Sequence, residues 1–246
     1  LMPCPSGMDH RSYLERFATR GMFDAMILAS VKRDDKRIGL LQSARIPFVL
    51  LGRCATQKDY SWIDLDFETS VTTALERMIA LGHRRIAVTV PKGGVNYGFI
   101  FLETYQKVLA RHGIAFDPAL VFPTIRTEIS GYDVMDTLLD LQERPTAILL
   151  VYELSAIGVY RRLIDAGLEP GRDMAVVGLR DDPSIRFLEP SLTCFGLSLS
   201  DLGRTLGTAL LAQIPRFREQ FPQARTEIIQ PLVLKPGKSD SFPPRL

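Results

Sequence analysis

The sequence predicts an α/β fold in which mostly parallel sheets are covered by helices on both faces. The stretch from Ile63 to Val90 contains a short strand, an amphipathic helix and a second strand apolar enough to be buried on both sides. Strand and helix patterns alternate in the same way along almost the whole chain, which is typical of parallel sheets. The 246 residues, 46% of them apolar, suffice for one large domain or two smaller lobes.

Charge and composition exclude several classes of protein. The formal net charge of +2 comes without a cluster of Lys and Arg, so these residues themselves are not expected to contact nucleic acid. No apolar run reaches the length of a membrane span. The three cysteines are an odd number without metal-ligand spacing, which argues against a disulfide framework and favours a reducing cytosol.

Two signals define the expected elements. Apolar residues at spacings of three and four, such as Val71, Ala74 and Leu75, mark helices, and short continuous apolar runs mark buried strands. Gly82 can end the central helix in the left-handed conformation, and Asp9 can cap the first helix. The expected strands cover 23–29, 46–51, 63–66, 86–90, 120–122, 146–151, 174–179, 192–195 and 227–234; the expected helices cover 9–20, 34–41, 71–81, 99–112, 129–141, 154–166, 181–183 and 199–214, with a tail from 236.

The residues of greatest interest are those that directly follow the strands. Open parallel sheets bind ligands beyond the carboxyl ends of their strands, where the strand order reverses. That rule selects Ser30–Lys32, Gly52, Arg53, Pro91–Asn96, Arg126, Tyr152, Glu153 and Arg180–Asp182.

Several long segments resemble one family of bacterial regulators. IPFVLLGR, IDLDFETSVTTALERMIALGHRRIAVTV, PTAILLVYELSAIGVYRRLIDAGLEPGRDMAVVGLRDDPSIRFLEPSLTCF and SLSDLGRTLGTALL look like the effector-binding domain of LacI/GalR-type transcription regulators. The likeness covers about Phe23 to Val233, in family order and at family spacing. It implies two Rossmann-like lobes with parallel sheets joined by three crossing strands, the architecture of type I periplasmic binding proteins.

The resemblance also implies lobe boundaries. The first lobe would comprise 1–65 and 195–224, and the second 66–194 and 225–240, followed by a tail over 241–246. Crossings are expected near 64–67, 194–197 and 225–229. Family members carry an N-terminal helix-turn-helix, followed by a first strand and helix, so we expect further residues upstream of Leu1.

The expected pocket departs from the pattern of sugar-binding members. Phe101, Tyr152 and Leu197 stand at positions that bind hydroxyl groups in relatives, whereas Arg126 and Arg180 are expected to face the cleft. Two arginines favour an acidic ligand, because guanidinium recognises planar carboxylate or phosphate and two of them repel unless an anion lies between them. Alternatively, Glu153 and Asp181 neutralise the two arginines in a structural network.

The resemblance implies a cytoplasmic ligand-sensing domain that binds a small-molecule effector between the lobes, and the two arginines favour an acidic sugar derivative or organic acid as that effector. Operator DNA would be bound through the absent N-terminal domain, and the chain would form a homodimer through the helices 8–20, 33–44 and 182–188. The alternatives are a periplasmic solute-binding protein of a transporter, or an enzyme that uses Glu153 and Asp181. No catalytic motif, cofactor or metal site is expected, because GxSxG, HExxH and CxxC are absent from the sequence.

Overall fold

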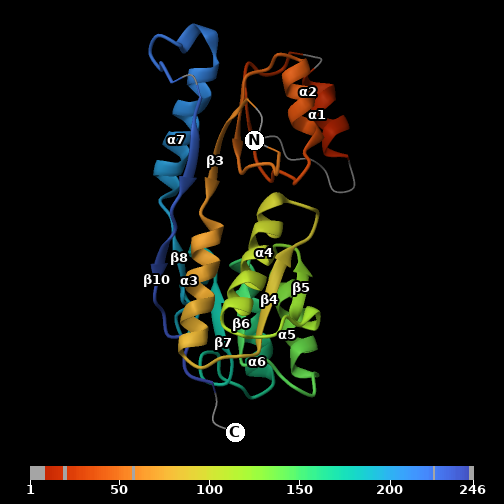
Figure 1. Cartoon of the computed structure of the whole chain (residues 1–246), viewed down its shortest axis with the longest axis vertical. Helices are drawn as coiled ribbons and strands as arrows, with labels where there is room; N and C mark the ends of the chain where they lie inside the picture. Colours follow the sequence, from red (N-terminus) through yellow and green to blue (C-terminus); the bar gives the residue numbers. More distant parts are fainter. Residues whose placement is uncertain (1–8, 19–20, 57–58, 224, 244–246) are drawn as a thin grey trace. The chain divides into compact units, whose positions relative to one another are not determined.

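In the computed structural model of the chain, the described residues are 9–18, 21–56, 59–223 and 225–243. The chain divides into two compact units, the first formed by Leu1–Leu65, Val95–Tyr97 and Ser198–Gln230, the second by Asp66–Gly94, Gly98–Leu197 and Pro231–Leu246. Each unit contains a four-stranded parallel sheet, which confirms the predicted α/β class (Figure 1).

The first unit is a sheet with helices on both faces. Its strand order is β1-β2-β3-β9, and α7 packs against β1, β2 and β3. A cluster of buried apolar side chains joins Leu14 and Leu41, from the first two helices, to Leu50 and Trp62 of the sheet. The elements are α1 (His10–Ala18), β1 (Met26–Leu28), α2 (Lys36–Ser43), β2 (Phe48–Leu51), β3 (Ser61–Leu65), α7 (Leu199–Gln213), the 3₁₀ turn η3 (Pro215–Phe217) and β9 (Glu227–Gln230).

The second unit has the strand order β5-β4-β6-β7. The connections through α4 and through α5 and α6 step along the sheet in opposite directions, so right-handed crossovers place α4 on one face and α5 and α6 on the other (Figure 1). A short antiparallel ladder of β8 and β10 completes the unit. The elements are α3 (Phe67–Ala80), β4 (Ile86–Pro91), α4 (Asn96–Arg111), η1 (Pro118–Leu120), β5 (Val121–Thr124), α5 (Glu128–Leu139), β6 (Ala147–Leu150), α6 (Leu154–Asp165), β7 (Ala175–Gly178), η2 (Pro183–Ile185), β8 (Cys194–Gly196) and β10 (Val233–Lys235).

Side-chain caps fix where several helices begin. Asp35, Asp66, Thr127 and Ser198 each accept a hydrogen bond from a backbone N–H in the first turn of the helix that follows. At the other end of α3, Gly82 has a φ of +102°, the left-handed conformation expected for a residue that ends a helix. These caps set the positions at which the loops after the strands end.

The final strand differs from the prediction. The residues from Glu227 to Leu234 form two strands rather than one: β9 pairs with β3 in the first unit, and β10 pairs with β8 in the second. Pro231 lies between them and cannot donate a backbone hydrogen bond to a ladder. Residues 225–230 therefore belong to the first unit, whereas the sequence had assigned them to the second.

The predicted tail is part of the second unit as far as it is described. Ser239 is completely buried, and its Oγ donates to the carbonyl of Val176 at 2.6 Å. The Asp240 carboxylate, also buried, is ion-paired with Arg77, and the carbonyl of Ser241 lies 2.7 Å from Nε2 of His83. The segment 236–241 is thus anchored; residues 244–246 lie outside the described residues.

Candidate functional site

Three charged residues meet at the carboxyl edge of the second sheet. Arg126 follows β5, Glu153 follows β6 and Arg180 follows β7, and parallel strands bring all three to the same edge. The Glu153 side chain is fully buried, whereas 49% of the Arg126 side chain and 34% of the Arg180 side chain remain exposed. The sequence prediction grouped these residues, and the structure brings them into direct contact.

The two guanidinium groups bind the same carboxylate. Nε of Arg126 donates to Oε1 of Glu153 at 2.6 Å, and its Nη2 contacts the same oxygen. Nη2 of Arg180 lies 3.1 Å from Oε1 and 3.2 Å from Oε2. A buried carboxylate is costly unless it is paired and hydrogen-bonded, so the two arginines offset the cost of burying Glu153.

The two aspartates that follow Arg180 have other roles. Asp181 pairs with Lys235 of β10, and this pair raises the pKa of the Lys235 ammonium. Asp182 accepts hydrogen bonds from the backbone and side chain of Ser184, which lower the pKa of its carboxyl group, and its Oδ2 lies 3.6 Å from Nη2 of Arg126. Glu153 thus pairs with both arginines, whereas Asp181, which the alternative prediction also paired with them, pairs with Lys235 instead.

Three apolar or aromatic candidates lie in different environments. Phe101 is fully buried, on the face of α4 that also buries Tyr105 and Val108. It is a core side chain, because positions three and four apart on this helix point into the unit, and the ligand-contact prediction does not fit it. Tyr152 and Leu197 are half-buried, the first beside Glu153 and the second directly after β8.

The remaining candidates belong to the first unit, after β2. Gly52 has a φ of +110°, and its N–H donates to the carbonyl of Ile63 at 2.7 Å. Nε of Arg53 lies 3.2 Å from Oδ2 of the buried Asp64, with the guanidinium 6.0 Å from the centre of the Trp62 ring. The loop after β2 therefore places a half-buried cation at the carboxyl edge of the first sheet.

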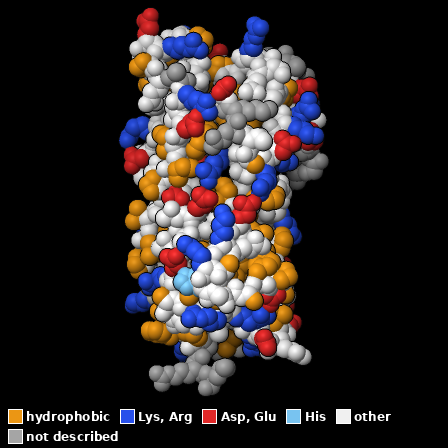
Figure 2. Space-filling view, viewed as in Figure 1, with side chains coloured by type: hydrophobic (Ala, Val, Ile, Leu, Met, Phe, Trp, Pro, Cys, Tyr) orange, Lys and Arg blue, Asp and Glu red, His pale blue; other side chains and the backbone are white. Residues whose placement is uncertain are grey.

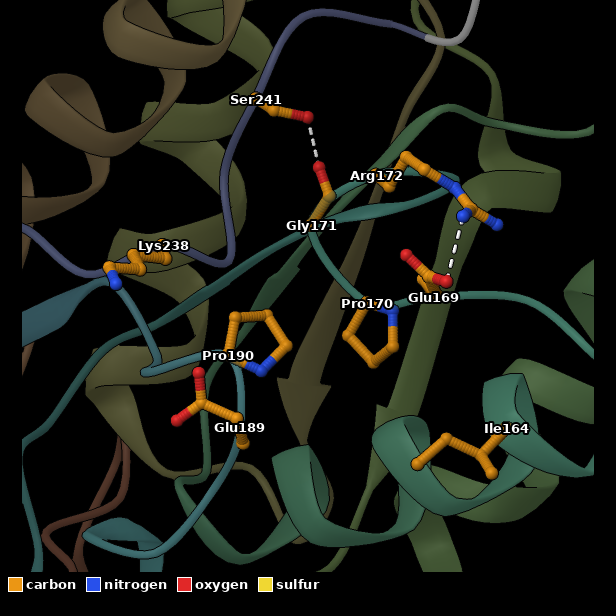
Figure 3. A pocket seen from close by; sticks show the side chains of 9 residues that line it. All are labelled: Ile164, Glu169, Pro170, Gly171, Arg172, Glu189, Pro190, Lys238 and Ser241. Carbon is orange, nitrogen blue, oxygen red and sulfur yellow. Dashed lines mark hydrogen bonds and ion pairs between the residues drawn. The ribbon is translucent and has the colours of Figure 1, made fainter.

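Cavities occur elsewhere on the units as well. One of about 570 Å³ is lined in the second unit by residues that precede β7, by Glu189 and Pro190, and by the C-terminal segment. Figure 3 shows the rings of Pro170 and Pro190 on opposite sides of this space, with Arg172 bonded to Glu169 at its edge. In the first unit, a cavity of about 360 Å³ lies beside Asp35. Burial opposes ionisation of Asp35, but hydrogen bonds from Arg37 and the backbone of Lys32 outweigh it and lower the pKa of the carboxyl group.

The described residues were also compared with the requirements of a metal site, a membrane span and a nucleic-acid-binding surface. Within the described residues, no three His, Cys, Asp or Glu side chains are grouped so that they could hold a metal ion. None of the described helices is both long and apolar enough to cross a membrane. On the face in Figure 2, acidic and basic side chains are intermingled rather than gathered by sign, unlike the basic surface that nucleic acid requires.

A family model described as a periplasmic binding protein-like domain matches residues 75–239. The chain belongs to this family. Its curated relatives include the HTH-type transcriptional regulators AglR of Rhizobium meliloti (strain 1021), 30% identical over 84% of this chain, and CelR of Thermobifida fusca, 29% identical over 85%. The aligned region covers 59% of AglR and 62% of CelR, so the chain spans about three fifths of the length of these relatives.

Solved structures point to the same family. A LacI-family regulatory protein from Chloroflexus aggregans matches with a TM-score of 0.80 at 26% identity, over 97% of this chain and 84% of that one. A complex of the transcriptional regulator CelR with cellobiose matches with a TM-score of 0.82 at 26% identity, over 93% and 69% of the two chains. The predicted resemblance is confirmed: this is a LacI-type effector-binding domain, and the relatives are transcriptional regulators rather than enzymes.

Two ion pairs of this LacI-type domain, Lys235 with Asp181 and Arg53 with Asp64, were not predicted from the sequence. Lys235 lies 54 residues from Asp181, and no pattern of spacing connects them. Asp64 was interpreted only as part of a crossing strand, although a buried acid two residues after Trp62 requires a cation nearby. An acid inside an apolar strand was the available signal, and Arg53 in the preceding loop was the nearest candidate for its partner.

Proposed function

We propose that the chain is the ligand-sensing domain of a bacterial transcription regulator, in which a small molecule controls operator binding by a helix-turn-helix domain of the same protein. The observation that carries the proposal is the cluster of Arg126, Glu153 and Arg180 at the carboxyl edge of the second sheet, the edge at which α/β folds bind ligands. Support comes from relatives named HTH-type transcriptional regulators and from the similar CelR structure with cellobiose.

The ligand would act by favouring one conformational state over another. A ligand shifts such an equilibrium only by its difference in affinity between the states. The chain passes between its two units after Leu65, on either side of Val95–Tyr97, after Leu197 and after Gln230, and a hinge motion would be absorbed by residues at such connections. Among the predicted site residues, Leu197 lies at such a connection.

The proposal includes a cytoplasmic homodimer. A two-fold dimer matches the symmetry of a pseudo-palindromic operator.

Apolar side chains are exposed on the second unit, with Ile129 66% exposed and Phe187 96% exposed. A cavity of about 280 Å³ between α5 and α6, lined by Ile129, Tyr132 and Ile157, adds a concave apolar surface. We propose that a second copy of the chain covers these side chains. Phe187 lies within the predicted segment 182–188; the helix predicted over 8–20 lies partly outside the described residues.

Two measurements test the sensing function. Thermal unfolding of the chain in a panel of sugars, sugar acids and organic acids should reveal at least one ligand that raises the melting temperature, because a ligand that binds only the native state stabilises it. The same ligand should change the affinity of the full-length protein for its upstream DNA in a fluorescence-anisotropy titration. A ligand that binds tightly without changing DNA affinity would favour the solute-binding alternative.

A further inference from the structure

We infer that the effector carries an anionic oxygen group, a carboxylate or a phosphate, and that Arg126 and Arg180 bind it. This inference rests on the proposed sensing function and names the chemical class of its ligand. It starts from the way in which the two arginines share Glu153.

The two guanidinium groups lie next to each other. Nη2 of Arg126 and Nη2 of Arg180 both contact Oε1 of Glu153, so two positive charges are held against a single carboxylate. Asp182 forms a longer ion pair with Arg126, at 3.6 Å, and its charge also acts on Arg180; the hydrogen bonds from Ser184 leave that charge in place. Asp181 is engaged with Lys235. Among the described residues, Glu153 alone accepts hydrogen bonds from the two guanidinium groups, and their Nη1 groups remain able to donate to a further anion.

The solvent-facing side of the cluster offers guanidinium donors, with the partly exposed Asp182 carboxylate beside them. Both Glu153 oxygens are covered, because the side chain is fully buried beneath guanidinium groups that remain partly exposed. Each guanidinium uses Nε and Nη2 on Glu153, and the described residues provide no hydrogen-bond acceptor for Nη1 of either arginine. Guanidinium can only donate, so these free edges are complementary to a group that only accepts.

A neutral sugar fits this surface less well than an acid. A sugar hydroxyl divides its hydrogen bonding between donating and accepting, whereas each oxygen of a carboxylate or phosphate only accepts, as two guanidinium edges require. The half-buried Tyr152, next to Glu153 in the chain, could still contact an apolar part of the ligand. The position of the charge, rather than the number of hydroxyl groups, then decides which ligand binds.

The test compares neutral and acidic members of matched pairs: glucose with glucuronate, galactose with galacturonate, and ribose with ribose 5-phosphate. Isothermal titration of the chain should show an acid that binds at least about tenfold more tightly than its neutral counterpart. Added salt should weaken the binding of that acid.

Variants then localise the charge recognition. Arg180→Gln and, independently, Arg126→Gln should each weaken binding of the acid about tenfold or more. Arg172→Gln is the matched control, because Arg172 is exposed, paired with Glu169 and Asp173, and lies before β7 rather than after it. The affinity of the Arg172→Gln variant for the acid should equal that of the wild type. If one test variant fails to fold, the other variant and the comparison of matched pairs still decide.

The outcomes separate this inference from the proposed function. Neutral members that bind as tightly as their acids, or an acid whose affinity is unchanged in both test variants, would overturn the inference and leave a sensor of neutral ligands. A panel in which no member of any pair binds would remove both the inference and the support for sensing.

Discussion

The imidazole of His83 lies between Oγ1 of Thr146, 2.8 Å from its Nδ1, and the carbonyl oxygen of Ser241, 2.7 Å from its Nε2. A carbonyl can only accept, so Nε2 carries a proton, and in the neutral ring Nδ1 accepts from the Thr146 hydroxyl. The ring is almost fully buried and connects the start of β6 to the C-terminal segment. Burial of the ring favours its neutral form.

Stability of the second unit should therefore decrease in mild acid. Burial lowers the pKa of His83 below its ordinary value of 6.5, despite the opposing effects of the Ser241 carbonyl and Asp240. Below pH 6.5 the His83 side chain of the unfolded chain binds a proton that the folded chain does not bind. The free energy of unfolding therefore decreases as the pH is lowered, by at most about 1.4 kcal/mol per pH unit, until the pKa of the folded state is reached. Urea titrations at pH 7.5, 6.5 and 5.5 measure this slope.

His112 provides the matched control for that experiment, because its side chain is exposed. His83→Gln should remove most of the difference in stability between pH 6.5 and 5.5, whereas His112→Gln should retain it. Equal slopes in the two variants would assign the pH dependence to other groups.

Gly131 and Gly158 allow α5 and α6 to pack in direct backbone contact. A Cβ atom built on Gly158 would lie 1.9 Å from the carbonyl oxygen of Glu128, and one on Gly131 would lie 1.9 Å from that of Ser155. Alanine at either position must push the helices apart, so we expect a loss of at least about 1–3 kcal/mol in the free energy of unfolding.

Gly203 of α7 is the control for this pair, since a Cβ atom there would meet nothing within 4 Å. Gly203→Ala should stabilise the chain by about 0.5–1 kcal/mol, because alanine has the higher helix propensity. Thermal unfolding distinguishes the two directions. Destabilisation by Gly203→Ala similar to that by Gly158→Ala would show that close helix packing is not the cause.

Phe101 shows why local patterns predicted the fold better than the site. Its place on a helical apolar stripe predicted burial of the helix face, and the structure agrees. The resemblance placed the same residue in the pocket, although a large apolar side chain at a former polar position can instead join the core. Contacts such as Lys235 with Asp181 depend on tertiary structure and leave no local signal. The division of the predicted last strand into β9 and β10 at Pro231 did have a local signal, because proline interrupts the hydrogen bonding of a β-ladder.

Truncation of Phe101 tests the core assignment. Phe101→Ala should lower the free energy of unfolding by about 3–5 kcal/mol, and Phe101→Leu by less, because less of the buried volume is lost. Chemical denaturation measures both. Phe101→Ala with near-wild-type stability and weakened ligand binding would restore the original interpretation of this residue as a ligand contact.

The apolar surface beside α5 and α6 should determine the oligomeric state. Replacing the exposed Ile129 by Asp places a charge beside the cavity that Tyr132 and Ile157 line. Burying that charge without a countercharge in a subunit interface is strongly unfavourable, so the variant should be largely monomeric at concentrations at which the wild type is a dimer. Phe187→Asp should act in the same direction, since the phenylalanine is 96% exposed in the isolated chain. Sedimentation velocity over a range of concentrations measures the dissociation.

Leu199→Asp serves as the control, because Leu199 is 70% exposed but begins α7 in the first unit. A dimer that survives both test substitutions, but not Leu199→Asp, would place the interface on the first unit instead.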